Sequence, residues 1–153
     1  DERDLDSILK EDAAPYAWLG DLALPSVMPA HVIYPKVDKA PAGFSSVWVR
    51  DILRRRLGYD GVVFSDDLTM AVAGDILARA QAALGAGCDM VLVCNRPDLA
   101  DDLLARLNFE LPADSVARLR RLAPRVPAQD WDTLQQDTQY QHARRIRSEV
   151  LPV

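Results

Sequence analysis

The chain has 153 residues, of which 49% are hydrophobic and 27% are charged, a composition typical of one soluble globular domain with its own core. Its net charge of -5 argues against a non-specific nucleic-acid surface, because binding to phosphates requires clustered lysine and arginine side chains. No apolar run reaches the roughly 18 residues that a transmembrane helix needs, so we expect neither a membrane partner nor a nucleic-acid partner.

The first third of the chain is predicted to contain two helices and a strand. Apolar residues at helical spacing predict a helix over residues 3–19, which Pro15 interrupts. Residues 24–34 favour a strand or a strand-to-loop segment, and their prolines place it at a strand edge or end. After a loop over residues 35–44, Ser45 or Ser46 is expected to cap the second helix.

This second helix is predicted to bury one side and expose the other. Its core-facing stripe consists of Val49, Ile52, Leu53 and Leu57. The opposite face includes the arginine run over residues 54–56, which we expect to be solvated. Gly58 stands where a helix usually ends.

Residues 61–70 form the most informative stretch of the chain. The β-branched and aromatic residues 62–64 predict a short strand over residues 61–65, and Asp66 and Asp67 follow where we expect the strand to end. In parallel α/β proteins, ligands bind at the carboxyl ends of strands. The two carboxylates are therefore the candidate active site, although an aspartate pair by itself is more often part of a turn or a helix cap.

Two more elements of the same kind follow. Asp75 is expected to cap a helix over residues 76–86, and the apolar residues 89–94 predict a strand that is buried on both faces. Residues 95–98 then turn the chain into another predicted helix, which carries Leu99, Leu103, Leu104 and Leu107. This alternation of helix and strand implies an α/β fold with a parallel sheet. Three strands are too few to close a barrel and the chain begins with Asp1, so we expect a piece of a longer protein.

The character of the chain changes after residue 108, where we place a domain boundary. Prolines divide residues 109–153 into short helical pieces, among them a helix with a basic face over residues 114–122 and a polar helix over residues 130–150. We expect this helical C-terminal extension to pack on the outside of the domain formed by residues 1–108, with His142 at the surface.

The two cysteines indicate a reducing compartment. On one strand, Cys88 and Cys94 would be about 20 Å apart, which is too far for a disulfide. We expect both to be buried, reduced thiols, and hence a cytoplasmic protein. No cluster of cysteine and histidine has the spacing of metal ligands, so we predict no metal site and no cofactor.

Three blocks of sequence together resemble one enzyme family. They are MPAHVIY over residues 28–34, LGYDGVVFSDDLTM over residues 57–70 and AGCDMVLVCN over residues 86–95. In combination they are similar to the C-terminal half of the catalytic barrel in bacterial β-N-acetylhexosaminidases of glycoside hydrolase family 3. The resemblance implies a (β/α)8 TIM barrel, of which this chain would supply about strands 6–8. It also implies retaining hydrolysis of terminal β-linked N-acetylglucosamine, with muropeptides from peptidoglycan recycling as the carbohydrate substrate.

The nucleophile motif of the family maps onto Asp66, which the resemblance implies to be the catalytic residue. Successive strand side chains point to opposite sides, so Asp67 should be a structural acceptor for backbone N–H groups of the loop. The candidate substrate-binding residues are His31, at the end of the preceding strand segment, and Met70, as a wall of the sugar pocket. A histidine satisfied within a strand-end network and a methionine packed in the core are the plainer readings of these two residues.

The acid/base of the family is missing from this sequence. The resemblance implies that the acid/base is a histidine assisted by an aspartate. No Asp-X-His, Lys-His or Gly-His-Gly pattern occurs in this sequence. We therefore expect the isolated chain to be inactive without the N-terminal half of the same barrel. Residues 71–79 also form a shorter segment than the family usually has.

Two other classes of function remain open. A half-barrel exposes strand edges and apolar faces, so the chain would also suit a non-catalytic role as a binding or assembly module. A different β/α enzyme would use the aspartate pair to bind a metal, but no histidine or glutamate stands at the neighbouring strand ends.

Overall fold

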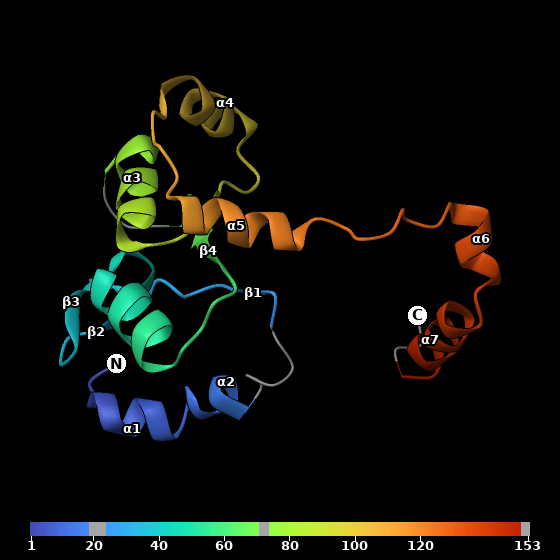
Figure 1. Ribbon diagram of the computed structural model, residues 1–153, viewed down its shortest axis with the longest axis horizontal. Coiled ribbons are helices and arrows are strands. Elements are labelled where there is room, and N and C mark those ends of the chain that lie inside the picture. The colour runs from blue at the N-terminus through green and yellow to red at the C-terminus, as the bar shows by residue number, and fades with distance from the viewer. Residues whose placement is uncertain (19–23, 71–73, 151–153) are drawn as a thin grey trace. The chain divides into compact units, whose positions relative to one another are not determined.

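The computed structural model of the chain describes residues 1–18, 24–70 and 74–150 (Figure 1). Its contacts divide the chain into two compact units, Asp1–Leu122 and Ala123–Val153, and each is described here by itself. Within the described residues, no helix combines the length and the apolar character that crossing a membrane requires.

A parallel three-stranded sheet forms the centre of the first unit. Its strands are β1 (Ser26–Val27), β4 (Val62–Asp67) and β5 (Met90–Leu92), and β4 is the middle strand. β4 pairs in parallel with both neighbours. The predicted α/β fold with a parallel sheet is therefore confirmed.

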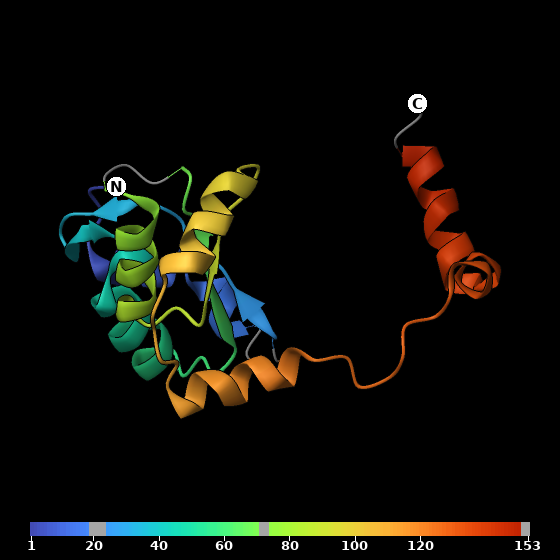
Figure 2. The same cartoon turned by 90° about the horizontal axis from the view of Figure 1, so that it is seen from above.

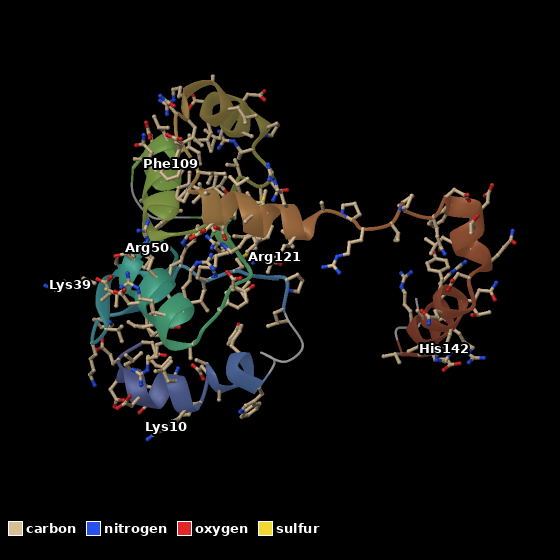
Figure 3. All side chains as sticks on the ribbon, in the orientation of Figure 1. Lys10, Lys39, Arg50, Phe109, Arg121 and His142 are labelled. Atoms are coloured by element: carbon tan, nitrogen blue, oxygen red, sulfur yellow. The ribbon has the colours of Figure 1, made fainter. Side chains whose placement is uncertain are left out.

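Helices connect these strands and cover them. They are α1 (Leu5–Lys10), α2 (Ala14–Trp18), the π-helix η3 (Val47–Arg56), α3 (Ile76–Ala86), α4 (Pro97–Arg106) and α5 (Ala113–Leu122). Figure 2 shows η3 and α3 on the same side of the sheet, with the end of α3 next to η3. Arg50, labelled in Figure 3, joins these two helices by donating to Gly85 O (2.9 Å) and Ala86 O (3.2 Å).

The predicted strand over residues 24–34 is divided into two strands. β1 ends at Val27, and β2 (Ile33–Tyr34) pairs antiparallel with β3 (Asp38–Pro41) in a separate sheet. Pro29 lacks an N–H group and cannot continue the ladder of β1. The short 3-10 helix η2 (Ala42–Phe44) then leads to η3.

The core lies between β4, η3, α3 and α4. It consists of Val49, Val63, Leu68, Ile76, Ala80, Ala83, Cys88 and Leu103. Ala80 and Ala83 are fully buried, and their small side chains allow α3 to lie close to its neighbours. Burial of Val49 and Ile52 confirms the predicted inner face of η3.

The prediction that the last strand is buried on both faces was also wrong. β5 is shorter than residues 89–94, and Met90 is exposed. The physical reason is its position, because β5 lies at the edge of the described sheet. Cys94 is exposed as well, while Cys88 is buried, and both are free thiols. Burial, followed by the negative charge of Asp89, raises the pKa of Cys88 to about 12.

The amino ends of β4 and β5 are joined by a buried ionic group, which we call the Asp89 cluster (Asp89, Arg54 and Arg118). The side chain of Asp89 is fully buried and bonds Arg54 Nη2 at 2.7 Å and Arg118 Nη2 at 2.8 Å. Its Oδ2 also accepts Val63 N at 2.9 Å. The predicted solvation of residues 54–56 was therefore wrong for Arg54, whose side chain reaches a carboxylate 35 positions away.

The Asp89 cluster ties α5 to the first unit. Arg118 lies on α5, and Arg121 of the same helix donates to the Asp60 side chain at 3.0 Å. The first unit consequently ends at Leu122, beyond the predicted boundary at 108. Residues 113–122 belong with the sheet because Arg118 pairs with the buried Asp89 carboxylate, whose charge would be costly to bury without a partner.

The second unit contains two helices where the sequence predicted one over residues 130–150. They are α6 (Trp131–Gln136) and α7 (Thr138–Val150). The side chain of Asp137 accepts Gln139 N at 2.8 Å and Tyr140 N at 3.0 Å, so it caps α7 and separates the helices. His142, labelled in Figure 3, is exposed on α7 as expected.

Candidate active site

Asp66 and Asp67 are the last two residues of the central strand β4. The predicted strand ends at residue 65, whereas β4 continues to Asp67, because Asp67 still pairs with Leu92 of β5. Both aspartates are half-buried. They lie at the carboxyl end of a parallel strand, where α/β proteins bind their ligands.

The pairing of β4 with β5 is irregular beside Asp66. Phe64 pairs with Met90 and Asp67 with Leu92, so two residues of β4 face a single residue of β5. This is a β-bulge, which bends a strand and redirects side chains. The extra residue lies within the pair Ser65–Asp66, so the bulge determines where the Asp66 carboxylate points.

One carboxylate oxygen of Asp66 is held and the other is available. Asp66 Oδ1 accepts the backbone N–H of Asp67 at 2.8 Å. Within the part of the chain that the structure describes, Asp66 Oδ2 has no hydrogen-bond or ion-pair partner. This arrangement fixes the orientation of the carboxylate and leaves one oxygen for a bound molecule.

Asp67 has a different environment. Its carboxylate accepts Thr69 N (2.9 Å), Thr69 Oγ1 (2.6 Å) and Cys94 N (3.1 Å). Partial burial raises the pKa of Asp67, but these hydrogen bonds and the nearby His31 together lower it below the usual value. The prediction that Asp67 is a structural acceptor for backbone N–H groups is therefore confirmed.

His31 lies at the same end of the sheet, 36 positions before Asp67. Its Nε2 is 3.1 Å from Asp67 O, and because a carbonyl only accepts, Nε2 carries the proton. The imidazole stacks on Phe44 with ring centroids 5.0 Å apart. Its Nδ1 is buried and has no partner among the described residues. The structure thus brings His31 into the strand-end network that one reading of the sequence expected.

Met70 follows this network and is 70% exposed. The alternative of core packing is therefore wrong for the chain by itself. Residues 71–73, part of the segment predicted to be short, lie outside the described residues. The substrate contacts of Met70 and His31 stay predictions.

A separate pocket of about 290 Å³ lies between α1, α2, β1 and η3. Its walls are mainly apolar and include Ile8, Val27 and Trp48, but none of the strand-end carboxylates. Such a lining suits packing of another apolar segment better than chemistry on a polar substrate. The carboxyl end of β4 therefore remains the candidate site.

Sequence reasoning missed two residues that shape the site. Ser65 is fully buried, with its hydroxyl between β4 and β5, and Thr69 holds the Asp67 carboxylate. A polar residue inside an apolar strand was a signal for Ser65, because a buried hydroxyl needs partners. For Thr69 the signal was its position two residues after an aspartate, a common local motif. Among the described residues, no group of three metal-ligating side chains is present.

Comparisons with known proteins agree on one family. A family model described as the glycosyl hydrolase family 3 N terminal domain matches residues 1–122, the same residues that form the first unit. A Beta-hexosaminidase from Bordetella bronchiseptica is 73% identical over 154 residues, which cover 99% of this chain and 44% of that protein. A Beta-hexosaminidase from Aromatoleum aromaticum is 56% identical and covers 95% of this chain and 42% of that protein.

A solved structure gives the same result. NagZ from Neisseria gonorrhoeae in complex with N-trifluoroacetyl-D-glucosamine is 40% identical, with a TM-score of 0.84 over 100% of this chain and 45% of that chain. This chain spans less than half the length of these relatives. It belongs to glycosyl hydrolase family 3, whose N-terminal domain model its first 122 residues match.

Proposed function

We propose that this chain is the nucleophile-bearing part of a retaining β-N-acetylhexosaminidase, with Asp66 as the nucleophile. The observation that carries the proposal is the Asp66 carboxylate, with Oδ1 held by Asp67 N and Oδ2 without a partner among the described residues. A nucleophilic carboxylate must be fixed and still reach the sugar. Family membership supports the same reaction class.

The three parallel strands fit about strands 6–8 of a (β/α)8 barrel. β1, β4 and β5 lie side by side in the sheet in the order of the chain, with η3 between β1 and β4 and α3 between β4 and β5. This is the arrangement of consecutive strands in such a barrel. The relatives are more than twice as long, which supports a second part that completes the barrel.

In this mechanism, Asp66 Oδ2 attacks the anomeric carbon of a terminal β-linked N-acetylglucosamine. The bond from that carbon to the leaving oxygen breaks, and the oxygen receives a proton from a general acid. Water then hydrolyses the glycosyl ester and releases the sugar. No Asp-X-His pattern like that of the family occurs in the sequence, so we infer that the acid/base comes from the part of the relatives that this chain does not cover.

The substrate class follows from the relatives. The names of the curated proteins and the glucosamine derivative bound to NagZ support an N-acetylhexosamine. Muropeptides derived from peptidoglycan are the proposed natural source, and the two free thiols support a reducing, cytoplasmic location. His31 and Met70 are the proposed substrate-binding residues at this end of the sheet.

A chimera tests the proposal. Residues 1–153 replace the matching segment of the Bordetella bronchiseptica relative, and hydrolysis of an aryl β-N-acetylglucosaminide is measured. We expect turnover by the chimera, none by the isolated chain, and a loss of at least about 1,000-fold in the chimera with Asp66→Ala. Asp67→Ala should retain more activity than Asp66→Ala. Near-normal turnover with Asp66→Ala would sink the assignment.

A role as a binding or assembly module is the second candidate. Met28 and Met90 are 50% and 38% exposed beside the outer strands β1 and β5, whose edges are unpaired in the described sheet. This function predicts that the chain self-associates in solution. Analytical ultracentrifugation checks it, and a monomer with cooperative unfolding would argue against it.

A further inference from the structure

We propose that Ser65 is a positioning residue, whose buried hydroxyl fixes the Asp66 carboxylate by completing the bulged ladder between β4 and β5. The inference rests on the proposed function of Asp66 and adds a residue to which no role in the reaction has been assigned. Ser65 is fully buried and cannot itself contact a sugar. Its influence on the reaction must therefore pass through Asp66.

The bulge leaves a backbone donor without its usual partner. Between the pairs Phe64–Met90 and Asp67–Leu92, β4 has one residue more than β5. At this point Leu92 N donates to Ser65 Oγ at 3.0 Å, so a side-chain oxygen takes the place of a carbonyl in the ladder. The ladder resumes one residue later, where Leu68 N donates to Leu92 O at 2.9 Å.

The same hydroxyl also holds the main chain of the proposed nucleophile. Ser65 Oγ donates to Asp66 O at 2.8 Å. On the other side, Asp66 Oδ1 accepts Asp67 N at 2.8 Å. The Ser65 hydroxyl thus links the Asp66 carbonyl to Leu92 of β5, and the carboxylate of the same residue is held by Asp67 N.

Loss of this hydroxyl would have a local effect. Ser65 is fully buried, and its replacement by alanine would leave the Leu92 N–H without its partner on β4. The strand would shift to recover a partner, and the Asp66 carboxylate would move with it. A displacement of about 1 Å at a reacting group can reduce the rate about 100-fold.

The test uses the chimera described above. We expect Ser65→Ala to reduce kcat about 10- to 100-fold with KM changed less than about threefold, because the substrate contacts stay in place. Ser65→Cys preserves the volume but has a poor hydrogen-bonding group, so it should resemble Ser65→Ala. Ser65→Thr keeps the hydroxyl and should recover most of kcat.

Ser45→Ala is the matched control. Ser45 is also buried, accepts a backbone N–H from Trp48 at 3.2 Å and donates to Asp38, but none of its hydrogen bonds involves β4 or β5. Its variant should shift the melting temperature as much as Ser65→Ala does while kcat changes less than about threefold. Equal losses of kcat in the two variants would overturn the inference.

Amide hydrogen exchange provides a readout that does not depend on activity. Ser65→Ala should accelerate exchange at Leu92 N, whereas Ser65→Thr and Ser45→Ala should not. Unchanged exchange at Leu92 in Ser65→Ala overturns the positioning role and leaves the role of Asp66 intact. A wild-type chimera without turnover overturns the proposed function and the positioning role together.

Discussion

The side chain of Asp89 is a carboxylate with no exposure to solvent, bonded to two arginines and a backbone N–H. Asp89→Asn removes the charge and leaves Arg54 and Arg118 partly buried without their counter-ion. We expect the free energy of unfolding to fall by about 3–5 kcal/mol, measured by urea unfolding. The control is Asp51→Asn, because the Asp51 side chain is 51% exposed and its bridge to Arg55 should contribute less than about 1 kcal/mol. Similar losses in the two variants would contradict this account.

The same residue predicts a pH dependence. Burial raises the pKa of Asp89, but hydrogen bonds from Arg118 and Val63 and the charge of Arg54 outweigh it, so the folded pKa lies below the unfolded value of about 3.9. A lowered folded pKa contributes stability above the unfolded value, and this contribution is lost as pH falls through the folded one. Below about pH 4 the wild type should therefore lose stability faster than Asp89→Asn. Parallel curves of unfolding free energy between pH 6 and pH 3 would refute the assignment.

Single residues also show why parts of the molecule were predictable. The position of Asp66 and Asp67 at a strand end was predictable because the stretch is continuous in sequence, and the role of Asp67 followed from the alternation of strand side chains. Burial of Arg54 could not be found in the same way. Its partner lies 35 positions away, so the local run of three arginines carries no trace of it.

Among the elements, α3 has the bounds that the sequence predicted, Ile76–Ala86. Its signals are local, since Asp75 accepts Ala78 N at the start and Gly87 adopts a left-handed conformation at the end. β5 was predicted less well. Burial at Met90 depends on which elements lie opposite the strand, and an apolar run alone does not contain that information.

Two glycines at the end of α3 predict opposite outcomes for the same substitution. Gly87 has a φ of 117°, and a Cβ there would meet Arg50 Cγ at 3.0 Å, so Gly87→Ala should destabilise the first unit. Gly85 lies within α3 with nothing within 4 Å of a Cβ. Gly85→Ala should raise stability by about 0.5–1 kcal/mol. Melting temperatures that move in the same direction would contradict the different backbone conformations of Gly85 and Gly87.

For the whole chain, the division after Leu122 predicts where a protease acts. Residues 123–130 form no helix or strand and are exposed, and they include Arg125. Limited trypsin digestion should first cut after Arg125 and leave a resistant product of residues 1–125. Mass spectrometry identifies the products. A first cut near Arg106 would instead favour the boundary at 108.

Much of the architecture at this scale was predictable, because alternation of helix and strand implies a parallel sheet. The place of the two carboxylates at the end of a strand was predictable, and the local pairing beside them was not. The bulge at Ser65–Asp66 results from the register between β4 and β5, which are separated in the chain by α3. No sequence pattern within β4 or β5 specifies that register.

The pairing of Asp89 with Arg118 has a consequence for synthesis on the ribosome. The two residues are 29 positions apart, so Asp89 emerges well before its second counter-ion. At about 5–20 residues per second, the interval is roughly 1.5–6 s. During this time Arg54 is the only available arginine of the cluster, and the nascent sheet carries a partly compensated charge. We therefore expect the first unit to complete its folding only after α5 has been translated.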